Sequence, residues 1–172
     1  MPQEILARYM PLLGGRVRLR LITPDDAWLH MRLSNEPNVR RFLGPSLNQT
    51  EETARNGLIR HLSEGEASLY VIELISDRTP VGYCGFSPNR DIPEKDMLIA
   101  LLPEYQDSGY GADVLGMLKD AWLGPLGHYE CFATVWPENT RAVALLLAHR
   151  FVKVREYVDF FGQVHHVYRC SS

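Results

Sequence analysis

The sequence predicts an α/β fold of the α+β kind, in which a mixed sheet carries helices on both faces. Strand-like and helix-like segments alternate along the chain in the order β-α-α-β-β-β-α-β-α-β-β. In addition, the apolar run Met97–Leu102 is followed by a turn and then by apolar residues at helical spacing. The 172 residues suit one domain, residues 1–172, with residues 1–15 as a short N-terminal extension.

The first half of the chain is expected to supply three strands and two helices. Residues 16–22 alternate arginine with apolar residues, as in a half-buried strand whose basic face is solvated. A helix begins after Thr23 and ends near Ser34, because threonine is a common N-cap and Pro24 suits the first helical position. The other elements are a helix after Thr50 with Ala54, Leu58, Ile59 and Leu62 inward, and a hairpin of strands 68–75 and 81–86.

The second half is organised around a strand expected at Met97–Leu102. All six of its residues are apolar, so the strand is expected to be covered on both faces. Val114, Leu115 and Leu118 lie at helical spacing, so the next helix is expected to begin near Gly109. The elements that follow are a strand at 129–135, a helix at 139–150 with Val143, Leu146 and Leu147 inward, and strands at 151–157 and 164–170.

Composition excludes several classes of protein. The net charge of −3 shows no basic excess, so a nucleic-acid binder is not expected. No apolar run approaches the roughly 20 residues of a membrane span, and residues 1–15 lack the layout of a signal peptide, so a cytoplasmic location away from membranes is expected. No metal site is expected, because His165 and His166 are neighbours on a strand and point to opposite faces. The three cysteines are expected to be buried free thiols: Cys84, Cys131 and Cys170.

The turn between the Met97–Leu102 strand and its helix is a candidate anion site. Gly109 and Gly111 allow the backbone to turn sharply and to approach a ligand without a Cβ in the way. The first N–H groups of a helix have no acceptor within the helix, so they point into this turn. A phosphate or pyrophosphate fits such a site.

Three segments carry a resemblance to a known family. Residues 106–111, QDSGYG, match the Q/R-x-x-G-x-G/A pyrophosphate loop of the GNAT acyltransferase superfamily, and residues 136–142 resemble its P-E-N-x-x-A/S segment. Residues 16–44 resemble the opening of the branch that acetylates ribosomal-protein N-termini, the ribosomal-protein-alanine N-acetyltransferases. The resemblance covers roughly residues 16–170. It implies a twisted, mostly antiparallel sheet of about seven strands flanked by four helices, opening between its fourth and fifth strands.

The same resemblance implies that the cofactor is acetyl-CoA or another short acyl-CoA. Its pantetheine arm would pair with the backbone of the central strand, and the N–H of Ile99 would act in catalysis as the oxyanion donor. The cofactor-binding residues implied are Leu101, Leu102, Gln106, Asp107, Ser108, Gly109, Tyr110, Gly111, Ala112 and Asn139.

The implied reaction is transfer of an acetyl or short acyl group to a primary amine, by direct attack through a tetrahedral intermediate. Asp96 is the preferred catalytic base, with Glu94 as the alternative, and the acceptor cleft is implied to include Arg41, Phe42 and His165. A protein N-terminal amine is the expected acceptor, and a small amine such as an antibiotic or polyamine is the alternative. The protein is expected to be a monomer or homodimer.

Departures from the family pattern keep a second class of function open. Asp107 and Ser108 stand where relatives commonly carry glycine and then a cation, and Leu146 stands where many carry a tyrosine acid, a role that Tyr105 is an alternative to fill. Arg150 replaces the glycine that usually ends the last helix. The alternative function is therefore a non-catalytic module that binds acyl-CoA. A dinucleotide site is less expected, because Val114 occupies the place of the third glycine.

Overall fold

The computed structural model describes residues 9–43, 48–64, 68–88 and 91–172, and its described part contains eight strands and five α-helices. The strands are β1 Leu12–Leu13, β2 Val17–Leu21, β3 Ser68–Leu74, β4 Pro80–Pro88, β5 Lys95–Leu101, β6 Glu130–Val135, β7 Val152–Val158 and β8 Val164–Ser171. The helices are α2 Ala27–Asn35, α3 Pro37–Leu43, α4 Glu51–Glu64, α5 Tyr110–Leu123 and α6 Thr140–Ala148. Short 3-10 turns at Pro24–Asp26 and Pro103–Tyr105 precede α2 and α5.

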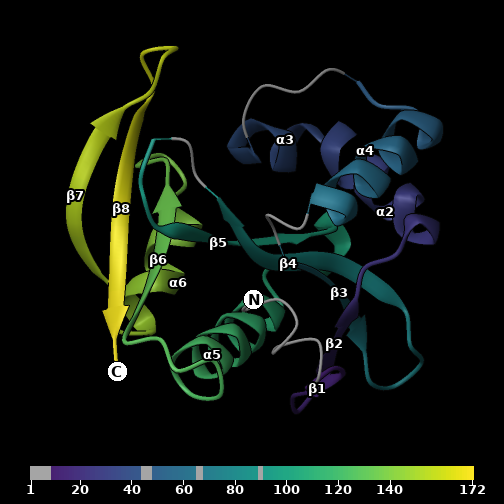
Figure 1. The fold of residues 1–172 in the computed structure, drawn as a ribbon, viewed down its shortest axis with the longest axis horizontal. Helices are drawn as coiled ribbons and strands as arrows, with labels where there is room; N and C mark the ends of the chain where they lie inside the picture. Colours follow the sequence, from purple (N-terminus) through teal and green to yellow (C-terminus); the bar gives the residue numbers. More distant parts are fainter. Residues whose placement is uncertain (1–8, 44–47, 65–67, 89–90) are drawn as a thin grey trace.

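All strands form one sheet in the order β1-β2-β3-β4-β5-β6-β8-β7, which is antiparallel except between β5 and β6 (Figure 1). The expected mixed fold with helices on both faces is therefore confirmed. The structure has one strand and one helix more than expected. The additional strand is the two-residue β1 in the N-terminal extension, and the additional helix is α3, which follows α2 after a single residue.

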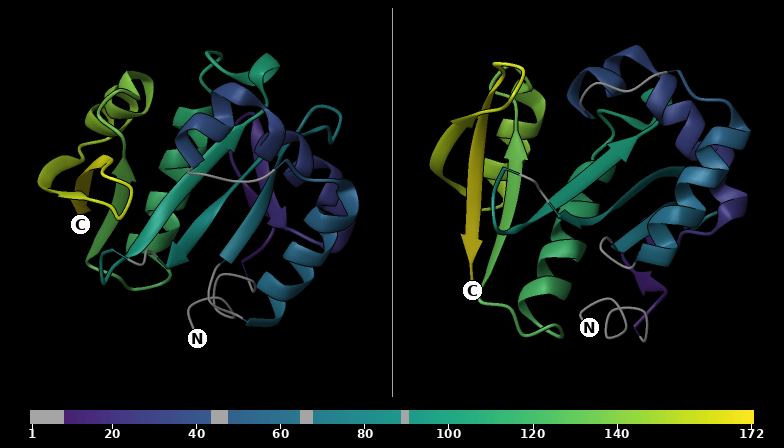
Figure 2. Two further views of the ribbon diagram at one scale, coloured as in Figure 1. Left: turned by 90° about the horizontal axis from the view of Figure 1, so that it is seen from above. Right: turned by 45° about the horizontal axis from the view of Figure 1, so that its top comes forward.

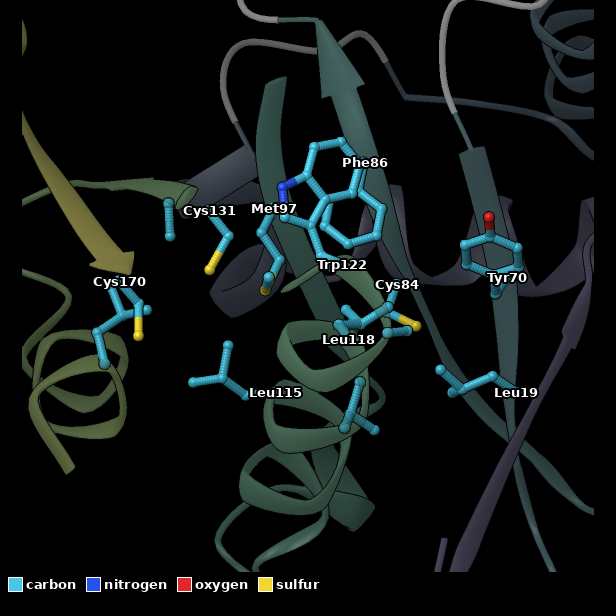
Figure 3. Packing of buried hydrophobic residues seen from close by; sticks show 14 of the residues in the cluster. Leu19, Tyr70, Cys84, Phe86, Met97, Leu115, Leu118, Trp122, Cys131 and Cys170 are labelled. Carbon is cyan, nitrogen blue, oxygen red and sulfur yellow. The ribbon is translucent and has the colours of Figure 1, made fainter. Parts of the chain in front are cut away.

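The sheet separates two apolar cores, and each core belongs to one group of helices. Helices α2, α3 and α4 cover one face, and the apolar core between them and the sheet includes Leu29, Leu33 and Leu58. Helices α5 and α6 cover the other face, and Figure 2 shows the two groups on opposite sides of the sheet. On the α5 face, the indole of Trp122 stacks on Phe86 with ring centroids 4.2 Å apart (Figure 3).

Three side chains expected to face inward are exposed instead. Ile59 and Leu62 of α4 are 49% and 41% exposed, and Leu147 of α6 is 56% exposed. Both helices pack on the sheet with narrower apolar stripes than the sequence suggests: Ala54 and Leu58 are buried on α4, and Leu146 is the buried residue of α6.

Arg18 and Arg20 of β2 are ion-paired and only partly exposed, which corrects the expectation of a solvated basic face. Glu73 lies directly opposite Arg18 in the pairing of β2 with β3 and is only 4% exposed. Its two carboxylate oxygens accept from Nε of Arg18 at 2.6 Å and from Nε of Arg20 at 2.5 Å. Arg20 also binds both carboxylate oxygens of Asp26, at 2.7 and 2.8 Å. A buried carboxylate on the neighbouring strand therefore organises both arginines.

The three cysteines are free and buried, as expected. Burial raises the pKa of the Cys131 thiol to about 12 and that of Cys84 further, so neither has the character of an activated nucleophile. Within the described ranges, no cluster of three or more His, Cys, Asp or Glu residues is placed to hold a metal ion. No helix in those ranges is both long and apolar enough for a membrane span.

Candidate active site

A gap opens in the sheet between β5 and β6. The two strands are parallel neighbours, yet the only residues paired between them are Asp96 and Phe132, close to the start of each strand. Beyond this pair the strands diverge, and Figures 1 and 2 show β5 turning away from β6. The edge of β5 from Met97 to Leu101 therefore faces the gap without a neighbouring strand.

Alternation along β5 determines which backbone groups point into this gap. The N–H of Leu102 donates to the carbonyl of Val81 at 2.9 Å, so Leu102 faces β4. In an antiparallel ladder, alternate residues direct their N–H and C=O groups to opposite edges, so Leu101 and Ile99 face the gap. A hydrogen bond supports this direction for the Leu101 carbonyl, because the carbonyl accepts from Nε2 of Gln106 at 2.9 Å. Ile99 and Leu101 thus direct their backbone groups into the gap, whereas the N–H of Leu102 is bound to β4.

The side chain of Asp96 lies where the strands separate. Its Oδ1 accepts from the backbone N–H of Thr134 at 2.6 Å, a donor that a continuing parallel ladder would pair with a carbonyl of β5. A hydrogen bond from an N–H to a carboxylate is stronger than one between neutral groups. Asp96 therefore ties β5 to β6 at the base of the gap and holds its own carboxylate in a fixed position there.

The turn that leads into α5 presents a row of unpaired backbone donors. Gly109 has φ 83°, a left-handed conformation that glycine adopts at little cost, and it is the N-cap of α5. The N–H of Gln106 donates to Pro103 and that of Asp113 to Gly109, but the N–H groups of residues 107–112 have no acceptor among the described residues. Six consecutive donors at the N-terminus of a 14-residue helix are the arrangement that an anion site requires.

Arg16, just before β2, reaches this turn from a distant part of the chain. Its Nη1 donates to the carbonyl of Ser108 at 2.9 Å, and its Nε pairs with Asp113 at 2.8 Å. The guanidinium lies 4.8 Å from the ring centroid of Tyr110. A fixed positive charge therefore stands beside the unpaired N–H groups.

A second arginine reaches the turn from α6. Arg141 donates to Oε1 of Gln106 at 2.8 Å and pairs with the carboxylate of Asp107 at 3.2 Å. Asp107 itself has φ 57°, a left-handed conformation that is costly for most residues other than glycine. The cation that the loop sequence lacks is thus supplied by a neighbouring helix, and Arg141 offsets the charge of Asp107.

Three further positions that the family resemblance singled out lie in or next to α6. The side chain of Asn139 is the N-cap of α6, since its Oδ1 accepts from the N–H of Ala142 at 3.2 Å. Leu146, at the tyrosine position of many relatives, is buried in the α5-face core. Arg150 has φ 67°, so it adopts at the end of α6 the left-handed conformation that suits glycine.

A cavity of about 630 Å³ lies on the face of the sheet that α2 and α3 cover. It is lined by residues of α2 and α3, by the residue after β6 and by the β7–β8 turn: Asn35, Pro37, Arg40, Arg41, Trp136, Asp159, Phe161 and Gln163. Its volume is in the range of small-molecule sites. The cavity thus lies on the opposite face of the sheet from α5, whose N-terminal turn carries the unpaired donors.

Trp136 brings two of the expected acceptor residues together. Phe42 of α3 meets its ring edge to face, with centroids 6.0 Å apart, and His165 of β8 meets it in the same way at 6.0 Å. His165 also stacks on Tyr157 at 4.8 Å, and its Nε2 lies 3.0 Å from Oδ2 of Asp159. Hydrogen bonds from the N–H of Gln163 and from His165 lower the pKa of Asp159, so this carboxyl stays ionised.

Glu94, the alternative base, is committed to an ion pair. Both oxygens of its carboxylate accept from Arg155 of β7, at 2.5 and 3.2 Å. This hydrogen-bonded pair lowers the pKa of Glu94, which makes its carboxylate a weaker base.

Sequence reasoning missed Arg16, Arg141, Trp136 and Asp159. Arg16 was part of the arginine row assigned to solvent, and Arg141 and Trp136 flank the P-E-N segment without belonging to its pattern. Asp159 lies in the turn between the closing strands, and its position beside His165 depends on the pairing of β7 with β8. Position next to a motif was the only indication the sequence offered.

Residues 16–152 match the family described as acetyltransferase (GNAT) domain, and the chain therefore belongs to this family of acetyltransferases. No curated protein matches it in sequence. In structure it is similar to a GNAT-family acetyltransferase from Bacillus anthracis, with 16% identity, a TM-score of 0.80, and coverage of 93% of this chain and 97% of that one.

Two further similar structures are of acetyltransferases whose names state their acceptors. The ribosomal-protein-S5-alanine acetyltransferase from Vibrio fischeri is 18% identical, with a TM-score of 0.75 and coverage of 93% of this chain and 95% of that one. The spermidine N-acetyltransferase from Vibrio cholerae, solved with CoA and spermine, is 19% identical, with a TM-score of 0.79 and coverage of 90% and 95%. Since one fold serves both kinds of acceptor, the acceptor has to be argued from this chain's own residues.

Proposed function

We propose that this acetyltransferase moves an acetyl group from acetyl-CoA to the primary amine at a protein N-terminus. The observation that carries the proposal is the row of six N–H groups at residues 107–112 that find no acceptor in the described part of the chain, beside the open edge of β5. These groups fit a pyrophosphate, and the gap-facing backbone of Ile99 and Leu101 fits the amides of a pantetheine arm. Acetyl-CoA would supply an acetyl group activated as a thioester.

The residues around the gap have separate roles in this proposal. The N–H of Ile99 points into the gap, and in this proposal it donates to the oxyanion. Asp96, held by the N–H of Thr134, accepts the proton of the acceptor amine, directly or through one water. Bringing the two reactants together from opposite faces supplies much of the acceleration, so no nucleophile of the protein is required.

The β7–β8 turn favours a protein acceptor over a small amine. Phe160 and Phe161 are 95% and 75% exposed, and Phe161 lines the acceptor cavity. Val158 is also 62% exposed on the adjoining strand. Exposed apolar side chains gathered at the rim of a site are typical of a surface that binds another macromolecule.

The proposal is tested by measuring thiol release from acetyl-CoA with three kinds of acceptor. These are lysine-free peptides with a free N-terminus, the same peptides with a blocked N-terminus, and spermidine. We expect turnover with the free peptides alone. Turnover with spermidine alone would assign the small-amine function, and calorimetric binding of CoA without turnover on any amine would assign the non-catalytic module.

Replacing Arg141 by glutamine is expected to weaken CoA binding. Arg141 lies at the turn that carries the unpaired N–H groups, and in the proposed complex it is a charged partner for the phosphates. Loss of one partly exposed charge should raise the Kd for CoA about fivefold, less at high salt. Calorimetry at low and high salt measures this effect. The matched control is Arg60→Gln on α4, which should leave the Kd unchanged; an equal Kd for Arg141→Gln would remove Arg141 from the site.

Replacing Asp107 by asparagine is expected to have the opposite effect on the Kd. Asparagine tolerates the left-handed conformation at φ 57° but carries no charge, so Arg141 would lose its competing partner. The Kd for CoA should fall about threefold, in keeping with a surface ion pair. Asp25→Asn, which alters the exposed pair with Arg55, is the control. A weaker affinity for Asp107→Asn would show that the carboxylate supports the loop rather than opposing the phosphate.

A further inference from the structure

The acceptor cavity has a positive wall that no carboxylate of the described chain neutralises. Most of the described arginines form an ion pair, but Arg40 and Arg41 of α3, which line the cavity, have no carboxylate partner in the part that the structure describes. By sequence, residues 44–50 between α3 and α4 contain no aspartate or glutamate. The charge of α3 at this wall is therefore available to a ligand.

Both arginines are held in position before any ligand binds. Nη1 of Arg40 donates to Oδ1 of Asn48 at 2.7 Å. The guanidinium of Arg41 lies 5.3 Å from the ring centroid of Phe42, which in turn packs against Trp136. A guanidinium that is already oriented loses less rotamer freedom when it binds a carboxylate.

Asp159, the acidic residue of the cavity lining, is already occupied. Its Oδ1 accepts from the N–H groups of Phe161 and Gln163, each at 2.9 Å, and its Oδ2 lies 3.0 Å from Nε2 of His165. These contacts fold the β7–β8 turn around the carboxylate. Asp159 is therefore engaged within its own turn, and because the lining holds two guanidinium groups against this one carboxylate, the cavity keeps a net positive charge.

We infer that the acceptor carries a carboxylate close to its reacting amine, and that it is a peptide N-terminus followed by aspartate or glutamate. The inference rests on the proposed function and narrows it. A guanidinium binds a carboxylate through paired, charge-assisted hydrogen bonds, whereas a polyamine would bring further positive charge against Arg40 and Arg41. The exposed Phe160 and Phe161 at the rim fit a peptide rather than a free amino acid.

The first arm of the test compares three peptides that differ only at the second and third residues, which are aspartates, asparagines or lysines. We expect kcat/KM to be about tenfold higher for the aspartate peptide than for the asparagine peptide, as one charge-assisted hydrogen bond predicts, and lowest for the lysine peptide. Free aspartate is the small-molecule arm. Its acetylation at a rate equal to that of the aspartate peptide would support the anionic class but overturn the peptide as its source.

The second arm uses variants of α3. In Arg40→Gln/Arg41→Gln, the aspartate-to-asparagine ratio of kcat/KM should fall to about 1, and in Arg41→Glu the preference should shift toward the lysine peptide. Arg60→Gln should keep the wild-type ratio, and thermal unfolding shows whether each variant is folded. A wild-type ratio near 1, or a ratio unaffected in the double variant, overturns the inference while the proposed function stands. Absence of thiol release with all peptides overturns the proposed function itself.

Discussion

Replacing Asp96 by asparagine is expected to lower kcat at neutral pH about 100-fold, the contribution typical of a general base, and to leave the thermal unfolding temperature almost unchanged. Asparagine keeps an oxygen that can accept from the N–H of Thr134, now 2.6 Å from Oδ1 of Asp96, so the tie between β5 and β6 is preserved. What it loses is the capacity to take up a proton. Steady-state kinetics and differential scanning fluorimetry on the same preparation measure the two effects separately.

Asp96→Ala is the companion variant, because it removes the base and the tie together. The N–H of Thr134 would lose its acceptor, and the free energy of unfolding should fall by about 1–3 kcal/mol. The pH profile gives the decisive reading for Asp96→Asn: the limb of kcat/KM that falls at acid pH should disappear with the carboxylate. An Asp96→Asn enzyme with nearly wild-type kcat would instead show that Asp96 only joins the two strands.

Local sequence patterns were sufficient to predict β5, α5 and the turn between them. The continuous apolar run at Met97–Leu102 and the glycine at 109 predict a strand, a turn and a helix, and the structure has β5, a left-handed Gly109 and α5 in these places. These features depend on interactions between residues close in sequence. For that reason, periodicity and glycine placement describe them well.

Features that depend on pairing between distant strands were beyond such patterns. The arginine row of β2 alternates like a solvated face, but Arg18 and Arg20 form ion pairs with Glu73, which lies opposite Arg18 only after β2 pairs with β3. The gap itself follows from the divergence of β5 and β6 after Asp96, and periodicity within either strand contains no information on it. The gap was expected from the family resemblance alone.

The acceptor cavity illustrates the same limit. Arg41, Phe42 and His165 were expected there from the family, and the structure packs Phe42 and His165 against Trp136 and places Arg41 in the cavity wall. Asp159 and Trp136 come from two separate segments that meet only in the folded sheet. Sequence alone therefore indicated single residues of the acceptor side, and the fold supplies the cluster that they form.

Replacing Glu73 by alanine is expected to lower the free energy of unfolding by about 3 kcal/mol, the lower part of the range for breaking a buried ion pair. Glu73 is only 4% exposed and accepts hydrogen bonds from Arg18 and Arg20. Its removal therefore leaves the partly buried Arg18 guanidinium without a carboxylate partner. Arg20 keeps Asp26 as a partner. Chemical denaturation of the wild type and the variant measures the difference.

Two further variants separate the charge from the packing around Glu73. Asp25→Ala breaks the exposed pair with Arg55, 3.1 Å apart, and should cost less than about 0.5 kcal/mol because solvent screens that pair. Arg18→Met combined with Glu73→Leu replaces both members of the buried pair by apolar side chains and should recover most of the stability lost in Glu73→Ala, since no uncompensated charge then remains. A Glu73→Ala variant as stable as the wild type would contradict this prediction. It would mean that water solvates the Arg18 guanidinium, whose side chain is 22% exposed, well enough to replace Glu73.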